Sequence, residues 1–361
     1  MYINNDLYKE DVMKAAEMVP EIERLYKKKF LITGATGLVA SFLIDIFMYL
    51  NLEKKAEIQI VALGRDQHKL CDRFRSYSED DRLKFLVQDV CEPLKVQETF
   101  DYMIHAAGDG YPAAFRKNPV GTMMPALTGT YHVLEYARNN PNCRVVYVSS
   151  GEVYGQGQEH QSAFTEDYCG PIELLNPRSC YPSAKRAAET LCAAFLQQYQ
   201  VDFVIARLGH TFGPNTTSYD NRANVQFINN VLNQEDIVLH SKGNQLRSYT
   251  YIADSAAGIL TVLLEGRSGE AYNIARTNEN ITIADFASIV AEAGKRKCIY
   301  SKPNEIEKEE QTPIRYAVLD SVKLQKLGWH SFYPVKKGVC HTISILKDIR
   351  ENSIEGKVYG K

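Results

Sequence analysis

The chain contains 361 residues, of which 45% are hydrophobic and 24% are charged, and its formal net charge is -2. Such a composition is typical of a globular protein with enough apolar material for a sizeable core. Because phosphate-binding surfaces usually leave a basic excess, this balance argues against nucleic acid as a partner. It is compatible with a local basic pocket for a small phosphorylated ligand.

Neither a membrane anchor nor a disulfide framework is expected. The longest apolar run, residues 41–50, is interrupted by Asp45 and falls far short of the roughly 20 residues that span a bilayer. Residues 1–10 carry acidic side chains and no apolar block, which is unlike a secretory signal. The eight cysteines are scattered without a CxxC pair, so we expect reduced thiols in the cytoplasm and no metal site.

The pattern of apolar residues in the first 210 residues predicts strands that alternate with helices. A charged, periodic segment at 6–28, interrupted by Pro20, is expected to form a helical extension in front of the main fold. Short apolar runs typical of buried parallel strands follow at 30–33, 58–63, 84–87, 102–105, 145–148 and 203–206. Helices are expected between them at 41–50, 120–138 and 181–200. This alternation predicts a doubly wound parallel α/β sheet of the Rossmann type.

After residue 210 the pattern becomes irregular. Shorter helices are expected at 222–233, 254–266 and 283–294, then a charged loop at 305–311 and a final helix at 320–327. These segments are expected to form a smaller mixed α/β lobe over the carboxyl edge of the sheet, where ligands of such folds bind. The predicted domains are a helical extension at 1–28, a dinucleotide-binding domain at 29–210 and a mainly substrate-binding lobe at 211–361.

A glycine-rich loop lies between the first predicted strand and the helix that follows it. Gly34 and Gly37 are followed by Ala40 at the third position of the pattern. Small residues there let the backbone turn tightly and approach a pyrophosphate, which meets the amide groups at the start of the helix. The loop therefore predicts a nicotinamide dinucleotide, NAD or NADP, as cofactor.

The residue after the second strand normally distinguishes the two dinucleotides, because an acid there binds the ribose hydroxyls of NAD. Here Gly64 occupies that position and Arg65 follows it. Arg65 could receive a 2′-phosphate, stack on adenine, or be a surface arginine, and taken alone it slightly favours NADP. Asp89, after the third strand, is a candidate acceptor for the adenine amino group.

A tyrosine and a lysine four residues apart begin the long predicted helix at 181–200. Tyr181 and Lys185 share one helix face, and the ammonium is expected to lower the phenol pKa toward neutrality. Tyr181 could then accept the proton of an alcohol that loses a hydride. Ser150, at the end of the fifth strand, could hydrogen-bond the same substrate oxygen.

In combination, these features resemble the extended short-chain dehydrogenases/reductases that modify nucleotide sugars. The resemblance covers about residues 28–350. Its further motifs are Ser150-Gly-Glu152-Val-Tyr-Gly155, Asn176-Pro-Arg-Ser-Cys-Tyr181, Thr211-Phe-Gly-Pro214, Arg247-Ser-Tyr-Thr-Tyr-Ile-Ala-Asp254 and Leu327-Gly-Trp329. Within the family, the chain most resembles UDP-glucuronic acid decarboxylases, which share a Ser/Thr-x-Glu-Val-Tyr-Gly run and a Pro-Arg-x-Cys-Tyr run.

The resemblance implies a role for each matching catalytic residue. Tyr181 would be the base, Lys185 its activator and a ribose contact, and Ser150 a ligand of the sugar C4 oxygen. Glu152 would lie beside the sugar, and Arg247 would bind the diphosphate, a task that suits its bidentate guanidinium.

The resemblance also implies the remaining contacts of both ligands. The cofactor would be held by Gly34, Thr36, Gly37, Leu38, Arg65, Asp89, Val90, Ala106, Ala107 and Lys185. His210 and Gln226 would contact the substrate, a nucleotide diphosphate sugar, and His210 would either donate to a phosphate when protonated or pack as a neutral ring. Because related proteins pair through the 120–138 and Tyr181 helices, a homodimer is expected.

Several positions depart from the decarboxylase pattern. Gly64 and Arg65 replace the usual acid, Ala126 stands where the family often has asparagine, and His210 and Gln226 also replace asparagines. The departures at 210 and 226 leave the nucleotide base open.

Four functions are compatible with the motifs. Oxidation at sugar C4 could lead to decarboxylation, which Glu152 favours, or to 4-epimerisation, whereas dehydration is disfavoured because position 151 is glycine rather than an acid. An NADP-dependent reductase of a nucleotide-linked ketosugar would suit Arg65. A non-catalytic nucleotide sensor is disfavoured by the intact Ser150, Tyr181 and Lys185.

Overall fold

A parallel sheet of seven strands forms the centre of the molecule. The structure is a computed structural model that describes residues 2–157, 162–301 and 316–358. The strand order is β11-β6-β5-β4-β1-β2-β3, and every neighbouring pair is parallel. The strands are β1 (Lys29–Thr33), β2 (Gln59–Gly64), β3 (Leu83–Val87), β4 (Tyr102–His105), β5 (Arg144–Ser150), β6 (Phe203–Leu208) and β11 (Ala271–Ile274). This confirms the predicted doubly wound Rossmann-type sheet.

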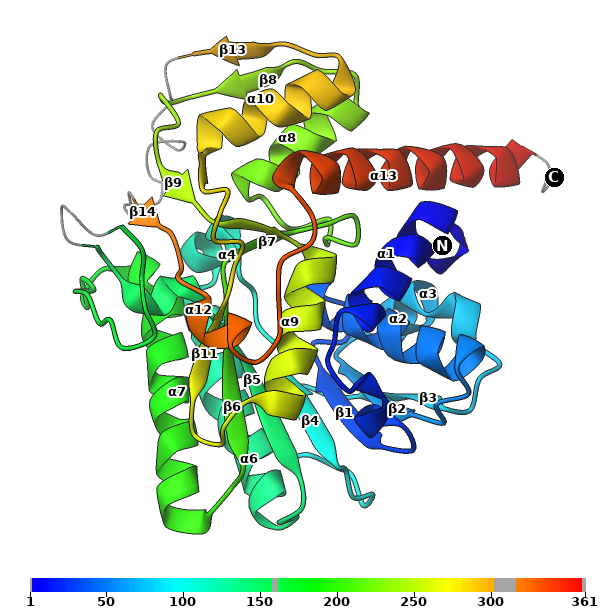
Figure 1. Ribbon diagram of the computed structural model, residues 1–361, viewed down its shortest axis with the longest axis vertical. Helices are drawn as coiled ribbons and strands as arrows, with labels where there is room; N and C mark the ends of the chain where they lie inside the picture. The colour runs from blue at the N-terminus through cyan, green and yellow to red at the C-terminus, as the bar shows by residue number, and fades with distance from the viewer. Residues whose placement is uncertain (1, 158–161, 302–315, 359–361) are drawn as a thin grey trace.

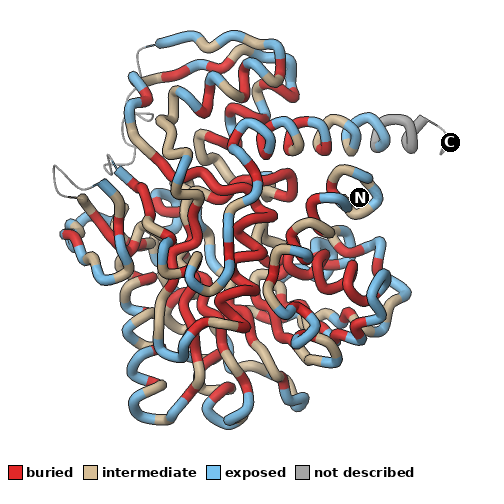
Figure 2. The backbone as a smooth tube through the Cα atoms, in the orientation of Figure 1, coloured by how far each residue is buried: buried red, intermediate tan, exposed pale blue. Residues whose placement is uncertain are grey.

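Helices cover both faces of this sheet, as expected for parallel strands that are buried on two sides. One face carries α1 (Asp6–Glu17), α2 (Leu38–Glu53) and α9 (Ile252–Glu265), which contact one another. The other carries α5 (Pro119–Met124), η4 (Pro125–Gly129), α6 (Thr130–Arg138) and α7 (Cys180–Tyr199). Buried residues are concentrated in the strands and in the helix faces that pack on them (Figure 2).

A smaller lobe stands above the carboxyl edge of the sheet, at the top of Figure 1. It contains α8 (Ala223–Leu232) and α10 (Ile283–Gly294), which pack together, and the paired strands β8 (Ile237–Leu239) and β13 (Cys298–Tyr300). A second small sheet has the order β12-β9-β14, formed by Ile281–Thr282, Leu246–Arg247 and Tyr316–Ala317. In the described part of the chain, no helix combines the length and apolarity needed to cross a membrane.

The structure differs from the predictions mainly after residue 210. The expected final helix at 320–327 is only the short α12 (Val322–Gln325), and a long helix not predicted, α13 (Val335–Val358), follows it. Its mixture of lysines, one threonine and two glycines gives a weak helical pattern, and packing on α10 and α1 stabilises it instead. In addition, α9 and β11 return to the large sheet although they lie beyond 210, and the expected loop at 305–311 lies outside the described residues.

The N-terminal extension is helical over a shorter range than expected, because α1 ends at Glu17, before Pro20. Asn5 caps α1 by accepting a hydrogen bond from the Tyr8 amide at 2.9 Å. Asp11 accepts hydrogen bonds from the Tyr251 hydroxyl at 2.6 Å and from His341 Nδ1 at 2.8 Å. The extension is therefore built into the fold by buried polar contacts.

Asp45 is the second anchor of the extension and lies fully buried on α2. It accepts hydrogen bonds from the Tyr8 hydroxyl at 2.6 Å and the Tyr77 hydroxyl at 3.0 Å, and it forms an ion pair with Arg73. Burial and this carboxylate both raise the pKa values of the two tyrosines, so the phenols stay neutral donors. One carboxylate thus joins α1, α2 and α3 (Gln67–Arg73).

We expect Asp45→Asn to lower the free energy of unfolding by about 3 kcal/mol, because it leaves the largely buried Arg73 without its counter-charge. Urea denaturation measures this change. The matched control is Lys9→Ala, which removes the exposed Lys9–Glu53 ion pair between the same two helices and should have little effect. Equal destabilisation by the two variants would contradict the importance of the buried cluster.

Candidate active site

A cavity of about 930 Å³ lies at the carboxyl edge of the sheet, between the two lobes. It is lined by the predicted residues Gly34, Thr36, Gly37, Leu38, Arg65, Asp89, Val90, Ala106, Ala107, Ser150, Glu152, Tyr181, Lys185, His210 and Arg247. Gln226 is the exception: it is exposed, lies outside this lining, and donates a hydrogen bond to the Asn221 carbonyl at 2.9 Å.

The glycine loop has the geometry required for close approach of a pyrophosphate. Gly34 has φ +67°, and a Cβ there would lie 2.8 Å from both the Ala106 carbonyl oxygen and Ala107 Cα. Gly37 is the N-cap of α2 and supplies no capping side chain. The first amides of α2 therefore face the cavity without a side-chain acceptor, and the loop fits the dinucleotide predicted for it.

At the other end of the cavity lie the ends of β2 and β3. The carboxylate closest in sequence to the end of β2, Asp66, accepts a hydrogen bond from the Lys69 amide at 3.1 Å and so caps α3. Asp89 accepts one from the Cys91 amide at 2.9 Å. Arg65 lines the cavity and makes no hydrogen bond or ion pair with another described residue. Its guanidinium is available to a ligand.

Tyr181 lies in the first turn of α7, where its ring stacks on Phe115 at a centroid distance of 4.8 Å. Burial raises the pKa of Tyr181 to about 12, and the hydrogen bond with Ser150 only partly opposes this shift. The expectation that Lys185 brings the phenol pKa toward neutrality is therefore wrong for the protein without ligands. Desolvation of the phenolate by burial is the main cause of the raised pKa.

Lys185 is buried one turn further along α7. Its ammonium donates a hydrogen bond to the Val148 carbonyl at 2.7 Å and lies 5.8 Å from the Tyr181 ring centroid. Burial lowers the pKa of Lys185 to about 8, although Glu189 acts in the opposite direction. Burial thus moves both members of the pair toward their neutral forms.

Glu152 is held beside Ser150 by two sets of contacts. Its amide donates to the Ser150 hydroxyl oxygen at 3.2 Å, and its carboxylate accepts from Arg178 at 3.2 and 3.3 Å. The Arg178 guanidinium also lies 4.5 Å from the Phe115 ring centroid. Phe115 and Arg178 therefore connect the position of Glu152 to that of Tyr181.

The smaller lobe contributes a second group of polar residues to the cavity. Arg247 is buried and donates to the Leu246 carbonyl at 2.8 Å. Arg222 is held by Asp220 and by the Thr211 carbonyl at 3.2 Å. Burial, with Arg247 and Arg222 next in effect, lowers the pKa of His210 far below its usual range. Of the two interpretations of His210, the structure supports the neutral ring.

Two arginines of this site were not among the predicted site residues. Arg178 lies within the Pro-Arg-Ser-Cys-Tyr motif, so its position three residues before Tyr181 was an available signal. Arg222 lies in no such motif, and only the folding of the smaller lobe brings it to the cavity.

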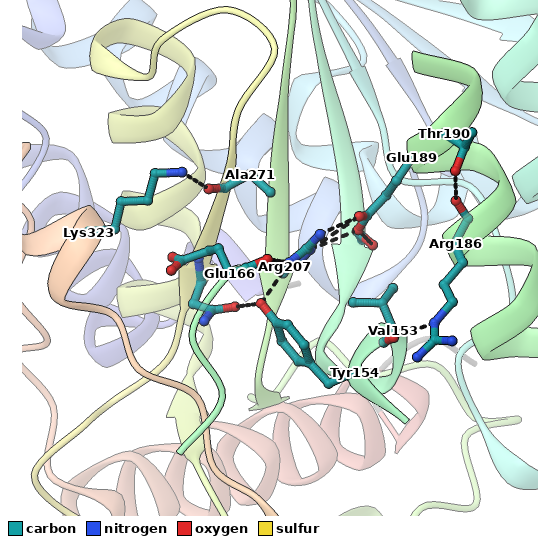
Figure 3. A network of polar contacts seen from close by, with 11 residues as sticks. Val153, Tyr154, Glu166, Arg186, Glu189, Thr190, Arg207, Ala271 and Lys323 are labelled. Carbon is teal, nitrogen blue, oxygen red and sulfur yellow. Dashed lines mark hydrogen bonds and ion pairs between the residues drawn. The ribbon is translucent and has the colours of Figure 1, made fainter. Parts of the chain in front are cut away.

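Behind the cavity, a buried polar network fixes the end of β5 against α7 and β6 (Figure 3). Glu189 accepts a hydrogen bond from the Ser149 hydroxyl at 2.6 Å and forms an ion pair with Arg207 at 2.7 Å. Arg207 also donates to the Tyr154 hydroxyl at 2.9 Å, and that hydroxyl donates to Asn273 at 2.6 Å. The network therefore holds the strand that carries Ser150 against the helix that carries Tyr181 and Lys185.

Because its pKa is raised to about 12, Tyr181 should stay protonated between neutral pH and about pH 10 in the protein without ligands. Ultraviolet difference titration of the wild type against Tyr181→Phe isolates this phenol from the other tyrosines. We expect no difference in tyrosinate absorbance over that range, and a step near neutral pH would contradict the raised pKa.

The relatives of this chain are nucleotide-sugar enzymes. It is 30% identical over 315 residues to UDP-glucuronic acid decarboxylase 6 of Arabidopsis thaliana, which covers 86% of each chain. It is 29% identical over 318 residues to UDP-glucuronic acid decarboxylase 1 of Danio rerio, which covers 88% of this chain and 72% of that one.

Solved structures of similar fold share less of the sequence. A dTDP-glucose 4,6-dehydratase from Streptomyces venezuelae with NAD bound matches with a TM-score of 0.77 at 21% identity, covering 89% of this chain and 98% of that one. A UDP-glucuronic acid 4-epimerase from Bacillus cereus, in complex with UDP-glucuronic acid and NAD, matches with a TM-score of 0.74 at 21% identity, covering 89% and 99%.

The family model for NAD dependent epimerases/dehydratases matches residues 30–275, which include the glycine loop, Ser150, Tyr181 and Lys185. The chain therefore belongs to the NAD dependent epimerase/dehydratase family.

Proposed function

We propose that this protein decarboxylates a nucleotide-linked uronic acid of the UDP-glucuronate type, with NAD as cofactor. The observation that carries the proposal is Glu152, held by Arg178 beside Ser150 and Tyr181 in the cavity. The curated relatives, which are UDP-glucuronic acid decarboxylases, support the same reaction.

The residues that would hold NAD follow from the lining of the cavity. The amides after Gly34 and Gly37 would bind the pyrophosphate, Asp89 would accept from the adenine amino group, and Lys185 would contact the ribose next to the nicotinamide. Arg65 would lie on the adenosine side. When bound, the nicotinamide would accept the hydride from sugar C4 and return it after the carboxylate has left.

The first role of the chain is to remove the proton from the C4 hydroxyl. Tyr181 would accept it, while the Ser150 hydroxyl donates to the same oxygen and fixes its position. A phenol with a pKa near 12 is a weak source of phenolate at neutral pH, so the positive charge of Lys185 is needed to stabilise the base. Burial of both groups strengthens this interaction between them.

The second role concerns the carboxylate. A ketone at C4 makes the C6 carboxylate that of a β-keto acid, so the C5–C6 bond can break and its electron pair can pass to the enolate at C4. Carbon dioxide leaves, and C5 takes a proton in its place. Arg178 would neutralise Glu152, and Arg247 would supply positive charge for an anionic substrate in the same cavity.

Loss of water is disfavoured at this site. Position 151 is glycine rather than an acid, and a Cβ there would lie 3.1 Å from the Leu319 side chain. Addition of a longer acidic side chain would therefore displace Leu319.

We also propose that the protein pairs with a second copy of itself through α5, α6 and α7, the face of the sheet on which α7 contacts both α5 and α6. Val120, Met124 and Tyr131, on α5 and α6, are exposed hydrophobic residues on this surface. Burying them in a helical interface would remove apolar area from water.

The decisive experiment is to incubate the purified protein with NAD and a panel of nucleotide sugars and to measure product masses. Loss of carbon dioxide from UDP-glucuronate is the expected result. Loss of water, gain of two hydrogens, or an unchanged mass with an epimer detected by NMR would replace decarboxylation by dehydration, reduction or 4-epimerisation. Stabilisation by nucleotide sugars without any product would indicate a sensor.

Tyr181→Phe should lower turnover by at least about a hundredfold, because the variant lacks the group that accepts the proton. NAD should still bind, since the ring and its stacking on Phe115 are kept. Tyr199→Phe, on the same helix but far from the cavity, is the matched control and should retain activity. A fully active Tyr181→Phe variant would refute the role of this tyrosine.

A further inference from the structure

The N-terminal extension contributes to the cofactor cavity itself. Tyr2, in the short helix η1 (Tyr2–Asn4), lines the same cavity as Gly34 and Asp89. Ile349, from α13 near the other end of the chain, lines it as well. Both segments lie on the side of the sheet that carries β2, β3 and α3 (Figure 1), which is the side of the predicted adenosine half.

The Tyr2 ring is fixed by contacts that lead to the buried cluster at Asp45. The Arg73 guanidinium lies 5.0 Å from the Tyr2 ring centroid, and the ring centroids of Tyr2 and Tyr8 are 5.4 Å apart. Arg73 and Tyr8 both bind Asp45, as described above. Tyr2 is therefore a part of the cavity wall whose position is fixed. Arg73 and Tyr8 connect it to Asp45 on α2, the helix that follows the glycine loop.

The two ends of the chain are also joined to each other across this wall. The Asn5 side-chain amide donates to the Asp348 carboxylate at 2.9 Å, and Asp11 accepts from His341 Nδ1 at 2.8 Å. These contacts connect α1 to α13, which lie side by side in Figure 1. We call the arrangement of Tyr2, Asn5, Asp348 and Ile349 the terminal clasp.

We propose that the terminal clasp binds the adenosine half of NAD and must open before the cofactor can leave. The Arg73 guanidinium lies over one face of the Tyr2 ring, and the ring and the aliphatic side chain of Ile349 both line the cavity, where they would form an apolar wall against a purine ring. The inference rests on the NAD dependence of the family and requires no particular sugar substrate. It gives a function to a segment that the motifs leave unassigned.

Such a clasp suits a reaction that returns its hydride within each turnover. The cofactor then needs no exchange, and slow release is no obstacle to the overall rate. A net reductase would instead have to open the clasp in every cycle, because oxidised cofactor must leave. The terminal clasp therefore favours reactions without net oxidation or reduction.

The test is the dissociation rate of NAD from loaded protein, measured after dilution into a dehydrogenase that consumes free NAD. We expect Tyr2→Ala to release NAD about tenfold faster, the change that corresponds to loss of one favourable aromatic contact. Tyr300→Ala, which truncates an exposed tyrosine on β13, is the matched control and should leave the rate unchanged.

Two variants test the bridge between the chain ends. Asn5→Ser keeps a capping oxygen for α1 but loses the amide that reaches Asp348, and Asp348→Ala removes the same hydrogen bond from the other side. Both should accelerate release by a similar factor. If the two variants have different effects on the release rate, or if neither has an effect, the Asn5–Asp348 hydrogen bond is not part of the terminal clasp.

Tyr2→Leu distinguishes a purely structural role of Tyr2 from a role in NAD binding. Relative to Tyr2→Ala, it restores apolar volume but supplies no aromatic ring. Urea unfolding of the cofactor-free variants is measured in parallel. If Tyr2→Leu regains stability while NAD still leaves fast, the proposal is supported. If it also regains the wild-type rate, or if Tyr2→Ala never changes that rate, the proposal is overturned.

Gly34→Val tests the assigned cofactor site independently of the terminal clasp. Gly34 has a positive φ and no room for a Cβ, so this variant should lose NAD binding altogether. Unchanged NAD binding by Gly34→Val would refute the assigned cofactor site itself. Neither outcome depends on which nucleotide sugar the protein converts.

Discussion

The buried ion pair between Arg207 and Glu189 is the contact on which the geometry of the site depends. Arg207 lies on β6 and Glu189 on α7, and the Glu189 carboxylate also accepts a hydrogen bond from the Ser149 hydroxyl of β5. Since an α-helix turns once every 3.6 residues, Glu189 follows Lys185 by about one turn and Tyr181 by about two. One carboxylate thus joins β5 and α7, the two elements that carry catalytic groups, to β6.

The energetics of that pair explain why it specifies one arrangement. Both charges are largely removed from water, with side-chain exposures of 13% for Arg207 and 12% for Glu189, so each requires the other. Loss of either partner would leave an uncompensated buried charge, whereas small shifts of α7 along β5 would lengthen several hydrogen bonds together. Removing the two charges from water costs stability, but the joined contacts favour a single arrangement of β5, β6 and α7.

Desolvation also sets the chemistry of the two groups that face the cavity. It raises the pKa of Tyr181 to about 12 and lowers that of Lys185 to about 8, so each is biased toward its neutral form. A proton held by Tyr181 in the resting protein must be lost before this residue can act as a base. Glu189 opposes the shift of Lys185 and so helps to keep the activating charge at neutral pH.

The sequence predicted what local patterns encode. Apolar runs between turns identified six strands of the sheet, and the spacing of Tyr181 and Lys185 placed both on one helix face. Strand β11 has only four residues, in an irregular region, and it joins the sheet only by pairing with β6. The raised pKa of Tyr181 depends on burial by segments distant in the sequence, so the local motif suggested the opposite direction.

Contacts between segments distant in the sequence also explain why the balanced net charge gave little information about the cavity. Several arginines in or beside the cavity form ion pairs with carboxylates: Arg73 pairs with Asp45, Arg178 with Glu152, and Arg222 with Asp220. These pairs keep the formal charge near zero while they place guanidinium groups at fixed positions. Recognition of an anionic ligand then depends on the amides of the glycine loop and on groups such as Arg65 and Lys185, which pair with no carboxylate among the described residues. A composition count averages over these local arrangements, and only the fold shows which charges are already neutralised.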